Sequence, residues 1–345
     1  MPTPLIATLV LLLAATFSST AGAADKQLRI GTVAPNNSLY HRQLMELGEV
    51  WRAAQGGSAK YLVYPDGSQG GEAELARRMR IGQLQGALLS VVGLREIEPS
   101  ISALQNLPLL FKNWDEVDYV REKMRPAIEK KFLDKGFVVL AWGDAGWVRF
   151  FSKEVATRPG DYKKMKFFAW GAESEQQDIM KSLGYTPVPL ETSDILPAMQ
   201  TGMINVVPST PYFALASQVY TMAPHMLEIN WAPIVGAFVV TQKAWEEMSP
   251  AVQAAMRSAS DKAGVQLRTK ARQEVTEAVD AMSKRGLIIN RPNPAQLREW
   301  SELAEQLYPR IRGVMVPADT FDEVFFHLKA FRASQSASQS ASQGK

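Results

Sequence analysis

Short apolar runs alternate with amphipathic segments along residues 27–241, and this alternation is the first guide to the fold. The early runs cover residues 27–33, 60–64 and 85–92, and turn residues bound them. Their length is typical of β-strands. Segments with apolar residues at helical spacing lie between them, for example at 40–54. Strands that alternate with helices in this way predict a parallel sheet covered by helices, which is an α/β lobe.

A second set of strand-length runs begins after Trp147 and has its own helical segments. Residues 234–241 then form one more strand, after this second set is complete. A mature chain of about 320 residues also exceeds what one compact core usually holds. We therefore predict two lobes joined by two crossings of the chain. Lobe 1 would contain residues 25–145 and 232–250, and lobe 2 would contain residues 146–231.

The longest helical segment begins at Ser249 and Pro250, which suit the N-cap and the first helical position. Its apolar stripe continues until Gly286. A helix over 250–285 would be about 50 Å long, which is longer than one lobe. We predict that it connects both lobes, with 286–333 as a C-terminal helical segment packed on them. A coiled-coil segment is the alternative, although the stripe is not a sustained heptad.

Both ends of the chain differ in composition from its body. Residues 1–23 combine an apolar run with the small-x-small sequence Ala21-Gly22-Ala23, which predicts a signal peptide and a periplasmic location. No lysine or arginine precedes the apolar run, so a retained membrane anchor is the alternative. The tail 334–345 repeats Ser, Gln and Ala, and we expect it to be disordered.

Composition argues against several classes of function. The formal net charge is +3, with acids interleaved among the bases, so we expect no nucleic-acid partner. The chain has no cysteine, which excludes a lipoprotein, disulfides and thiol chemistry. His41, His225 and His327 stand apart from other metal-ligand types, and no phosphate-binding or nucleophile motif is present. We expect no metal, no cofactor and no enzyme, with a hydrolase triad assembled from distant residues as the alternative.

Several collinear segments resemble one known family, the DctP-type solute-binding proteins of TRAP transporters. These segments are YPDGSQGGEAEL (64–75), RIGQLQGALLSVVGL (80–94), LQNLPLLFKNWDEV (104–117), DYKKMK (161–166), GYTPVPLETSDILPAMQTGMIN (184–205) and KAWEEMSP (243–250). The resemblance implies a periplasmic binding protein-like fold, in which two α/β lobes close over a solute in a central cleft. It also implies delivery of that solute to TRAP membrane subunits. We expect a monomer.

One position departs from the family pattern in a way that bears on the ligand. In most relatives the segment that begins at Asp161 ends in an arginine, whose guanidinium binds a carboxylate of the solute. The matching residue here is Phe168. A ring cannot supply that charge-assisted contact, which is worth about 1.5–3 kcal/mol. We therefore place the chain in a divergent branch without this arginine, and we predict a small apolar or amphiphilic solute.

The resemblance also suggests two polar contacts, and aromatic residues near strand ends complete the candidate site. Ser209 replaces a usual asparagine. Arg149 is an approximate counterpart of a second family arginine. Its side chain either faces the cleft or forms an ion pair on the surface. Aromatic side chains near strand ends can bury about 150–250 Å² each, so we interpret them as the lining of an apolar cleft. Ordinary packing in the core is the alternative interpretation. The predicted ligand-binding residues are Ser90, Trp142, Trp147, Arg149, Phe168, Trp170, Ser209, Tyr212 and Trp231.

Two other functions remain open beside the receptor. An accessory protein of the same fold could use its cleft for a lipid carrier or a partner protein. The hydrolase with a hidden triad is the second. In the receptor, a polar end of the solute would meet Ser90, Ser209 or Arg149.

Overall fold

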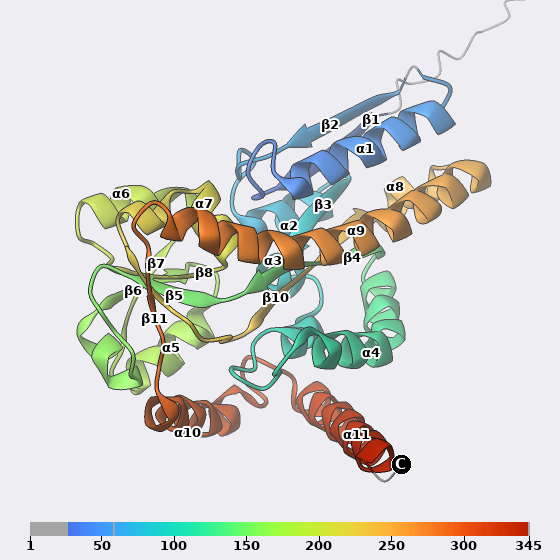
Figure 1. Cartoon of the computed structure of the whole chain (residues 1–345). Helices are drawn as coiled ribbons and strands as arrows, with labels where there is room; N and C mark the ends of the chain where they lie inside the picture. The colour runs from blue at the N-terminus through green and yellow to red at the C-terminus, as the bar shows by residue number, and fades with distance from the viewer. Residues whose placement is uncertain (1–26, 58, 344–345) are drawn as a thin grey trace, which may run out of the picture.

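The computed structural model describes residues 27–57 and 59–343. The expected signal peptide, residues 1–23, lies outside them. Two α/β bodies lie side by side, and a long helix passes along both (Figure 1). Lobe 1 is the body around the first sheet and lobe 2 the body around the second. This is the fold that the resemblance implied.

The sheet of lobe 1 has the strand order β2-β1-β3-β10-β4. β1, β2 and β3 pair in parallel, as the alternation of strands and helices predicts. β10 is antiparallel to both of its neighbours because it brings the chain back from lobe 2, so the sheet is mixed rather than parallel. The strands are β1 Gln27–Thr32, β2 Lys60–Tyr64, β3 Gly86–Ser90, β4 Phe137–Trp147 and β10 Pro233–Thr241.

Helices cover both faces of this sheet, and side-chain caps fix where they begin. Ser38 accepts a hydrogen bond at the start of α1, and Asn113 does the same for α4. The helical elements of lobe 1 are α1 Leu39–Ala54, α2 Glu72–Arg80, α3 Val91–Leu94, η1 Pro99–Leu104, α4 Trp114–Asp134 and α8 Gln242–Glu246.

The sheet of lobe 2 has the order β11-β9-β5-β8-β6-β7. Its strands are β5 Arg149–Ser152, β6 Lys166–Trp170, β7 Thr186–Leu190, β8 Val206–Ser209, β9 His225–Leu227 and β11 Ile288–Asn290. Its helical elements are η2 Pro159–Lys164, α5 Ser174–Ser182, η3 Thr192–Asp194, α6 Ile195–Gln200, α7 Pro211–Ala216 and η4 Val219–Thr221.

Alternate residues of β5 and β6 belong to two separate apolar clusters, one on each face of this sheet. Phe150 and Phe167 belong to the cluster that includes Trp300 of the C-terminal segment. Phe151 and Phe168 belong to the cluster of the opposite face. Every aromatic side chain of these strands is therefore committed to one face by its register.

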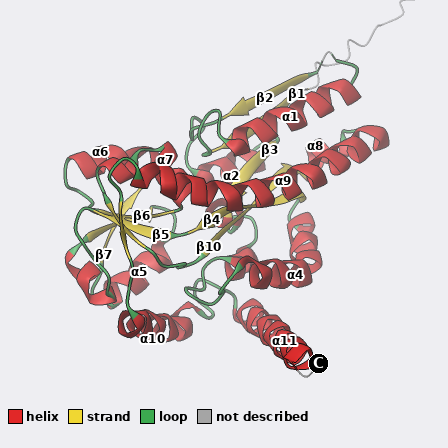
Figure 2. Ribbon diagram, in the orientation of Figure 1, coloured by secondary structure: helices red, strands yellow, loops and turns green. Residues whose placement is uncertain are grey.

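The long helix α9 Pro250–Ser283 packs against α1 and β4 in lobe 1 and against α7 in lobe 2 (Figure 2). The predicted position along both lobes is thus confirmed. Arg272 on this helix contacts Asp118 of α4 and Asp144 of β4, with both N–O distances at 2.6 Å. Asp144 is fully buried and also accepts from Arg121. These ion pairs hold α9 to the strand that crosses between the lobes.

The C-terminal segment begins with β11 and continues as α10 Pro294–Ile311 and α11 Ala318–Gln343. α10 contacts both lobes. Trp300 Nε1 donates to the carbonyl of Thr157 at 2.9 Å in lobe 2, and the Tyr308 hydroxyl donates to the carbonyl of Pro108 at 2.8 Å in lobe 1. α10 therefore bridges the two bodies on the side opposite α9 (Figure 1).

α11 continues to Gln343 through the tail that we expected to be disordered. Alanine and glutamine are good helix formers, and extending an existing helix avoids the cost of a new nucleus. Earlier in α11, Arg332 anchors it to Glu116 of α4 at 2.7 Å. Within the described part of the chain, no helix has both the length and the apolar character needed to cross a bilayer.

Candidate functional site

A cavity of about 150 Å³ lies where lobe 1, lobe 2 and α10 meet. Lobe 1 contributes the turn after η1 and the start of β10, and lobe 2 contributes β5, β6 and α5. The apolar lining includes Pro108, Ala232, Ile234, Val148, Phe150, Phe167, Trp170, Ile179, Met180, Leu183, Trp231, Trp300, Leu303, Leu307, Ile311 and Met315. Because all three parts of the molecule form its wall, relative movement of the lobes would change its shape.

Interlocked aromatic rings form the deep wall of the cavity. The ring of Phe150 lies 6.0 Å from Phe167, 5.4 Å from Trp231 and 5.6 Å from Trp300, measured between centroids. Trp231 and Trp300 meet edge to face at 5.6 Å. Such contacts fix the orientation of each ring. This wall is therefore pre-formed and apolar.

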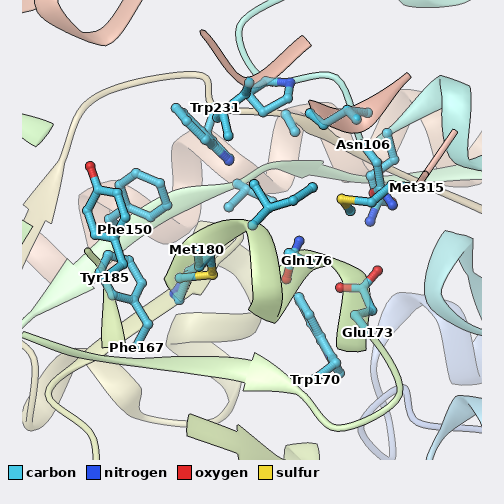
Figure 3. A pocket seen from close by; sticks show the side chains of 18 of the residues that line it. Asn106, Phe150, Phe167, Trp170, Glu173, Gln176, Met180, Tyr185, Trp231 and Met315 are labelled. Carbon is cyan, nitrogen blue, oxygen red and sulfur yellow. The ribbon is translucent and has the colours of Figure 1, made fainter. Parts of the chain in front are cut away.

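Polar side chains gather at the opposite end of the cavity, next to lobe 1. Figure 3 shows Asn106 and Glu173 on one side, near Met315 and Trp170, with Phe150 and Tyr185 on the other and Gln176 between them. Asn106 comes from the turn after η1, whereas Glu173 and Gln176 come from the start of α5. The cavity is therefore amphipathic, with its polar end at the junction of the lobes.

Glu173 is a buried acid with a raised pKa at this polar end. Its side chain is 2% exposed and lies 3.7 Å from the guanidinium of Arg95 in lobe 1. Burial raises the pKa of Glu173 to about 7, and the nearby Glu72 acts in the same direction, while Arg95 and Asn106 oppose them. Arg95 also contacts Glu175 at 3.2 Å. One arginine of lobe 1 thus bridges two carboxylates of lobe 2.

Three of the residues predicted from the sequence line this cavity: Phe168, Trp170 and Trp231. The ring of Phe168 packs edge to face on Trp170 at 5.0 Å. Phe168 is only 2% exposed and also belongs to the apolar cluster with Phe151 and Met199. Phe168, which the resemblance matches to an arginine of most relatives, is thus a packed side chain that also reaches the cavity.

The predicted polar contacts Ser90, Arg149 and Ser209 are not among the residues that line this cavity. The hydroxyl of Ser90 donates to the Glu72 carboxylate at 2.6 Å. Arg149 lies opposite Ser209 across β5 and β8, and its guanidinium is 3.5 Å from Glu228. Burial lowers the pKa of Arg149. Ser90 and Arg149 are therefore engaged with acids of the protein itself.

Trp142, Trp147 and Tyr212 also lie away from the lining of this cavity. Trp142 Nε1 donates to Glu129 at 2.7 Å, and Trp147 packs on Trp114 at 4.9 Å between centroids. Tyr212 of lobe 2 accepts from the backbone N–H of Leu39 in lobe 1 at 3.4 Å. The Tyr212 contact and the Arg95 pair therefore join the two lobes at separate places.

Sequence reasoning missed the polar end and the α10 wall. Asn106 and Glu173 are distant in sequence; Asn106 lies within the family-like segment 104–117, but nothing in that segment marks it as a solute contact, and Glu173 belongs to none of the quoted segments. One signal was available: Glu173 and Gln176 follow Trp170 directly at the end of a strand, where ligands bind in open α/β sheets. The apolar stripe of α10 was also visible in the sequence, but the sequence does not show which part of the molecule this stripe packs against. No group of three or more metal-ligand residue types lies together in residues 27–57 and 59–343.

Comparison with known proteins identifies the family. The family model for bacterial extracellular solute-binding protein, family 7 (DctP) matches residues 30–312. An uncharacterized protein of Haemophilus influenzae is 23% identical over 254 residues, which are 72% of this chain and 76% of that protein. The 2,3-diketo-L-gulonate-binding periplasmic protein YiaO of Escherichia coli is 21% identical over 280 residues, covering 78% and 82%.

A solved structure shows the same fold. The TRAP periplasmic solute-binding protein of Ralstonia eutropha, with bound (S)-2-acetolactate, has a TM-score of 0.81 and 19% identity. The match covers 88% of this chain and 99% of that one. The chain therefore belongs to the bacterial extracellular solute-binding proteins of family 7, the DctP family of non-enzymatic receptors.

Proposed function

We propose that the chain is the periplasmic solute receptor of a TRAP-type transport system. In this proposal it acts as a monomer, captures a small apolar or amphiphilic solute between its lobes and delivers it to the membrane subunits. Membership of the DctP family supports the transport role. The observation that carries the choice of solute is the aromatic wall of the cavity beside Trp231 and Trp300.

The size of the cavity limits the solute. A cavity of about 150 Å³ is comparable to an engineered apolar cavity that binds benzene. Burial of about 150 Å² of apolar solute surface contributes about 4 kcal/mol, at about 25 cal/mol per Å². The solute would therefore be about as large as one six-membered ring with a short polar end. This volume also argues against a lipid carrier, and so against the accessory-protein alternative.

Small organic acids are the competing class of solute, because YiaO and the Ralstonia protein bind such compounds. Two features argue against them here. Phe168, which the resemblance matches to the carboxylate-binding arginine of most relatives, is packed among apolar side chains. At the polar end of the cavity, Arg95 is already shared between Glu173 and Glu175. An incoming carboxylate would compete with these two acids for one guanidinium.

Closure of the lobes would complete the capture. Asn106 of lobe 1 and Glu173 of lobe 2 both line the cavity, so separation of the lobes would open its polar end. A solute that touches both sides stabilises the closed form by its difference in affinity between the two forms.

Thermal-shift and ligand-observed NMR screens of the mature protein test the proposal. We expect toluene and other single-ring compounds to raise the melting temperature and to bind with a measurable Kd. Succinate and sugar acids should produce neither effect. Tight binding of short dicarboxylates without binding of single-ring compounds would refute the proposed solute class.

A further inference from the structure

A glutamine in the turn after η1 presents a buried amide to the cavity. Gln105 lines the cavity and is 6% exposed. Its backbone N–H donates to the carbonyl of Ser102 at 3.2 Å, which holds the residue at the end of η1. Its side-chain Oε1 accepts from the backbone N–H of Val235 near the start of β10, at 3.3 Å. The backbone and the side chain of Gln105 are therefore both held by lobe 1.

The hydrogen bond to Val235 decides which group of the amide remains available. A backbone N–H can pair only with the amide oxygen, so Oε1 faces Val235 and the Nε2 group is left on the other arm. Nε2 makes no hydrogen bond to any residue of 27–57 or 59–343, and it is not fully enclosed by protein atoms. Since Gln105 lines the cavity, a solute can reach this donor from there.

The other polar side chains of the lining are either paired or half-buried. Asn106 and Glu173 are hydrogen-bonded to each other. The Tyr185 hydroxyl donates to a backbone carbonyl at 3.2 Å, and Trp300 Nε1 donates to another at 2.9 Å. The half-buried side chains, which water can reach, are Trp170, Gln176 and Trp231. Among the described residues of the lining, Gln105 is thus a buried side chain that keeps a donor for a solute.

The charge of the lining limits what this donor can receive. Among the described residues, no lysine, arginine or histidine lines the cavity, whereas the acid Glu173 does. A carboxylate would be buried there without a countercharge, which is costly. A single N–H donor suits an uncharged oxygen acceptor instead. We infer that Gln105 is a specificity-determining residue, whose Nε2 group donates to an uncharged carbonyl group on a ring-sized solute.

The inference rests on the proposed function, because it assumes that the cavity holds the solute. It adds the polar group that the solute carries and the residue that recognises it. Because Val235 already holds the amide of Gln105, little side-chain entropy is lost when Nε2 donates. The half-buried side chain of Gln176 has no such anchor among the described residues and would first have to be ordered. Gln105 should therefore contribute more selectivity than Gln176.

Acetophenone and α-methylstyrene test the inference, because they have nearly the same shape and differ by a carbonyl oxygen against a methylene group. Each is titrated against the mature chain by ligand-observed NMR at pH 8. This pH lies above the pKa of Glu173, which is about 7, so its carboxyl is largely ionised and offers no second donor. We expect acetophenone to bind about fivefold more tightly, the factor that one net hydrogen bond contributes. Benzoate should bind at least about tenfold more weakly than acetophenone.

Variants show whether Gln105 causes the preference. Gln105→Met keeps the length of the side chain and removes the donor, and we expect the preference for acetophenone to fall below about twofold. The matched control is Gln177→Met, because Gln177 is equally buried but its Nε2 donates to the Trp170 carbonyl at 2.8 Å and it does not line the cavity. The control should keep the fivefold preference. Gln176→Met and Trp231→Phe remove the rival donors.

A spectroscopic readout keeps the test decisive if Gln105→Met does not fold. In the ¹⁵N NMR spectrum of the wild type, acetophenone should shift the assigned side-chain NH₂ signals of Gln105 downfield, and α-methylstyrene should not. Unshifted signals at saturating acetophenone would overturn the inference without any variant.

The outcomes separate this inference from the proposed function. Equal affinities of acetophenone and α-methylstyrene would overturn the role of Gln105, and so would a preference that survives Gln105→Met. Loss of the preference in Gln176→Met or Trp231→Phe alone would assign the donor to that residue instead. In these cases both probes still bind, and the apolar cavity stands. If neither probe binds, and toluene does not bind either, the cavity is not a solute site and both proposals fail.

Discussion

The guanidinium of Arg95 in lobe 1 lies 3.7 Å from the carboxylate of Glu173 in lobe 2, and both side chains are almost fully buried. This pair joins the lobes at the polar end of the cavity. Glu173 therefore has two roles, as part of the cavity lining and as part of the contact between lobes. In the proposed function, this side chain would couple solute binding to lobe closure.

The raised pKa of Glu173 predicts a pH dependence of stability. In the folded state the pKa is about 7, whereas an unperturbed glutamate titrates near 4.5. Folding therefore takes up a proton between these values, so the stability that Glu173 contributes is fully present below pH 4.5 and is lost as the pH rises through 7. A shift of this size corresponds to about 3 kcal/mol.

Urea denaturation of the wild type and Glu173→Gln from pH 5 to 8 measures this effect. We expect the wild type to lose stability relative to Glu173→Gln as the pH rises, because glutamine does not titrate. The control is Glu175→Gln, since Glu175 is more exposed. Parallel pH profiles for the wild type and Glu173→Gln would contradict the prediction.

Replacement of Phe168 by arginine tests whether this position can serve as a carboxylate-binding site. The ring is 2% exposed and packs on Trp170 within the apolar cluster of lobe 2. An arginine there would bury an unpaired charge, and we expect a loss of more than about 3 kcal/mol in the free energy of unfolding. Phe168→Leu is the control, with an expected loss of about 1 kcal/mol. A stable Phe168→Arg protein that binds succinate would show that the position can still serve an acid.

A larger side chain on α10 should block the cavity without disturbing the polar end. Leu303 lines the cavity, so Leu303→Trp would fill much of its 150 Å³. We expect toluene affinity to fall at least about tenfold, because the solute would have to displace the new ring. Leu297 lies on the same helix and is 43% exposed, which makes Leu297→Trp the matched control. Equal toluene affinity in the two variants, measured by NMR titration, would place the solute elsewhere.

The packing of α9 against β4 should depend on Arg272. Its guanidinium contacts Asp118 and the fully buried Asp144, and it lies 4.5 Å from the ring of Trp114. Arg272→Met removes one of the two cations that face Asp144, the other being Arg121. We expect a loss of about 3 kcal/mol in urea denaturation, since breaking one side of a buried network leaves a charge poorly compensated. A change below about 0.5 kcal/mol would show that Arg121 alone suffices.

Periodicity predicted the elements well because it is a local property of the chain. The strand at 60–64 and the long helix from Pro250 were both readable from apolar spacing and caps. The antiparallel direction of β10 was not predicted, because direction depends on where the chain returns from lobe 2. The helical tail to Gln343 was likewise missed, since composition alone does not reveal a helix that continues from a packed segment.

The candidate site was predicted only in part. Trp170 and Trp231 line the cavity because apolar aromatics near strand ends are drawn into the space between layers. Ser90 stands at a strand end as expected, but its hydroxyl is bound to Glu72. Side-chain hydrogen bonds of this kind cannot be predicted from the spacing of apolar and polar residues along the chain. The polar end joins Asn106 and Glu173 from different lobes, and only the folded chain brings them together.

Identification of the solute that copurifies with the mature protein tests the central claim most directly. The protein is purified without added ligand and denatured, and the released compound is analysed by mass spectrometry and NMR. We predict an uncharged compound with a body about the size of one ring. Release of a dicarboxylate or a sugar acid in stoichiometric amount would contradict the account.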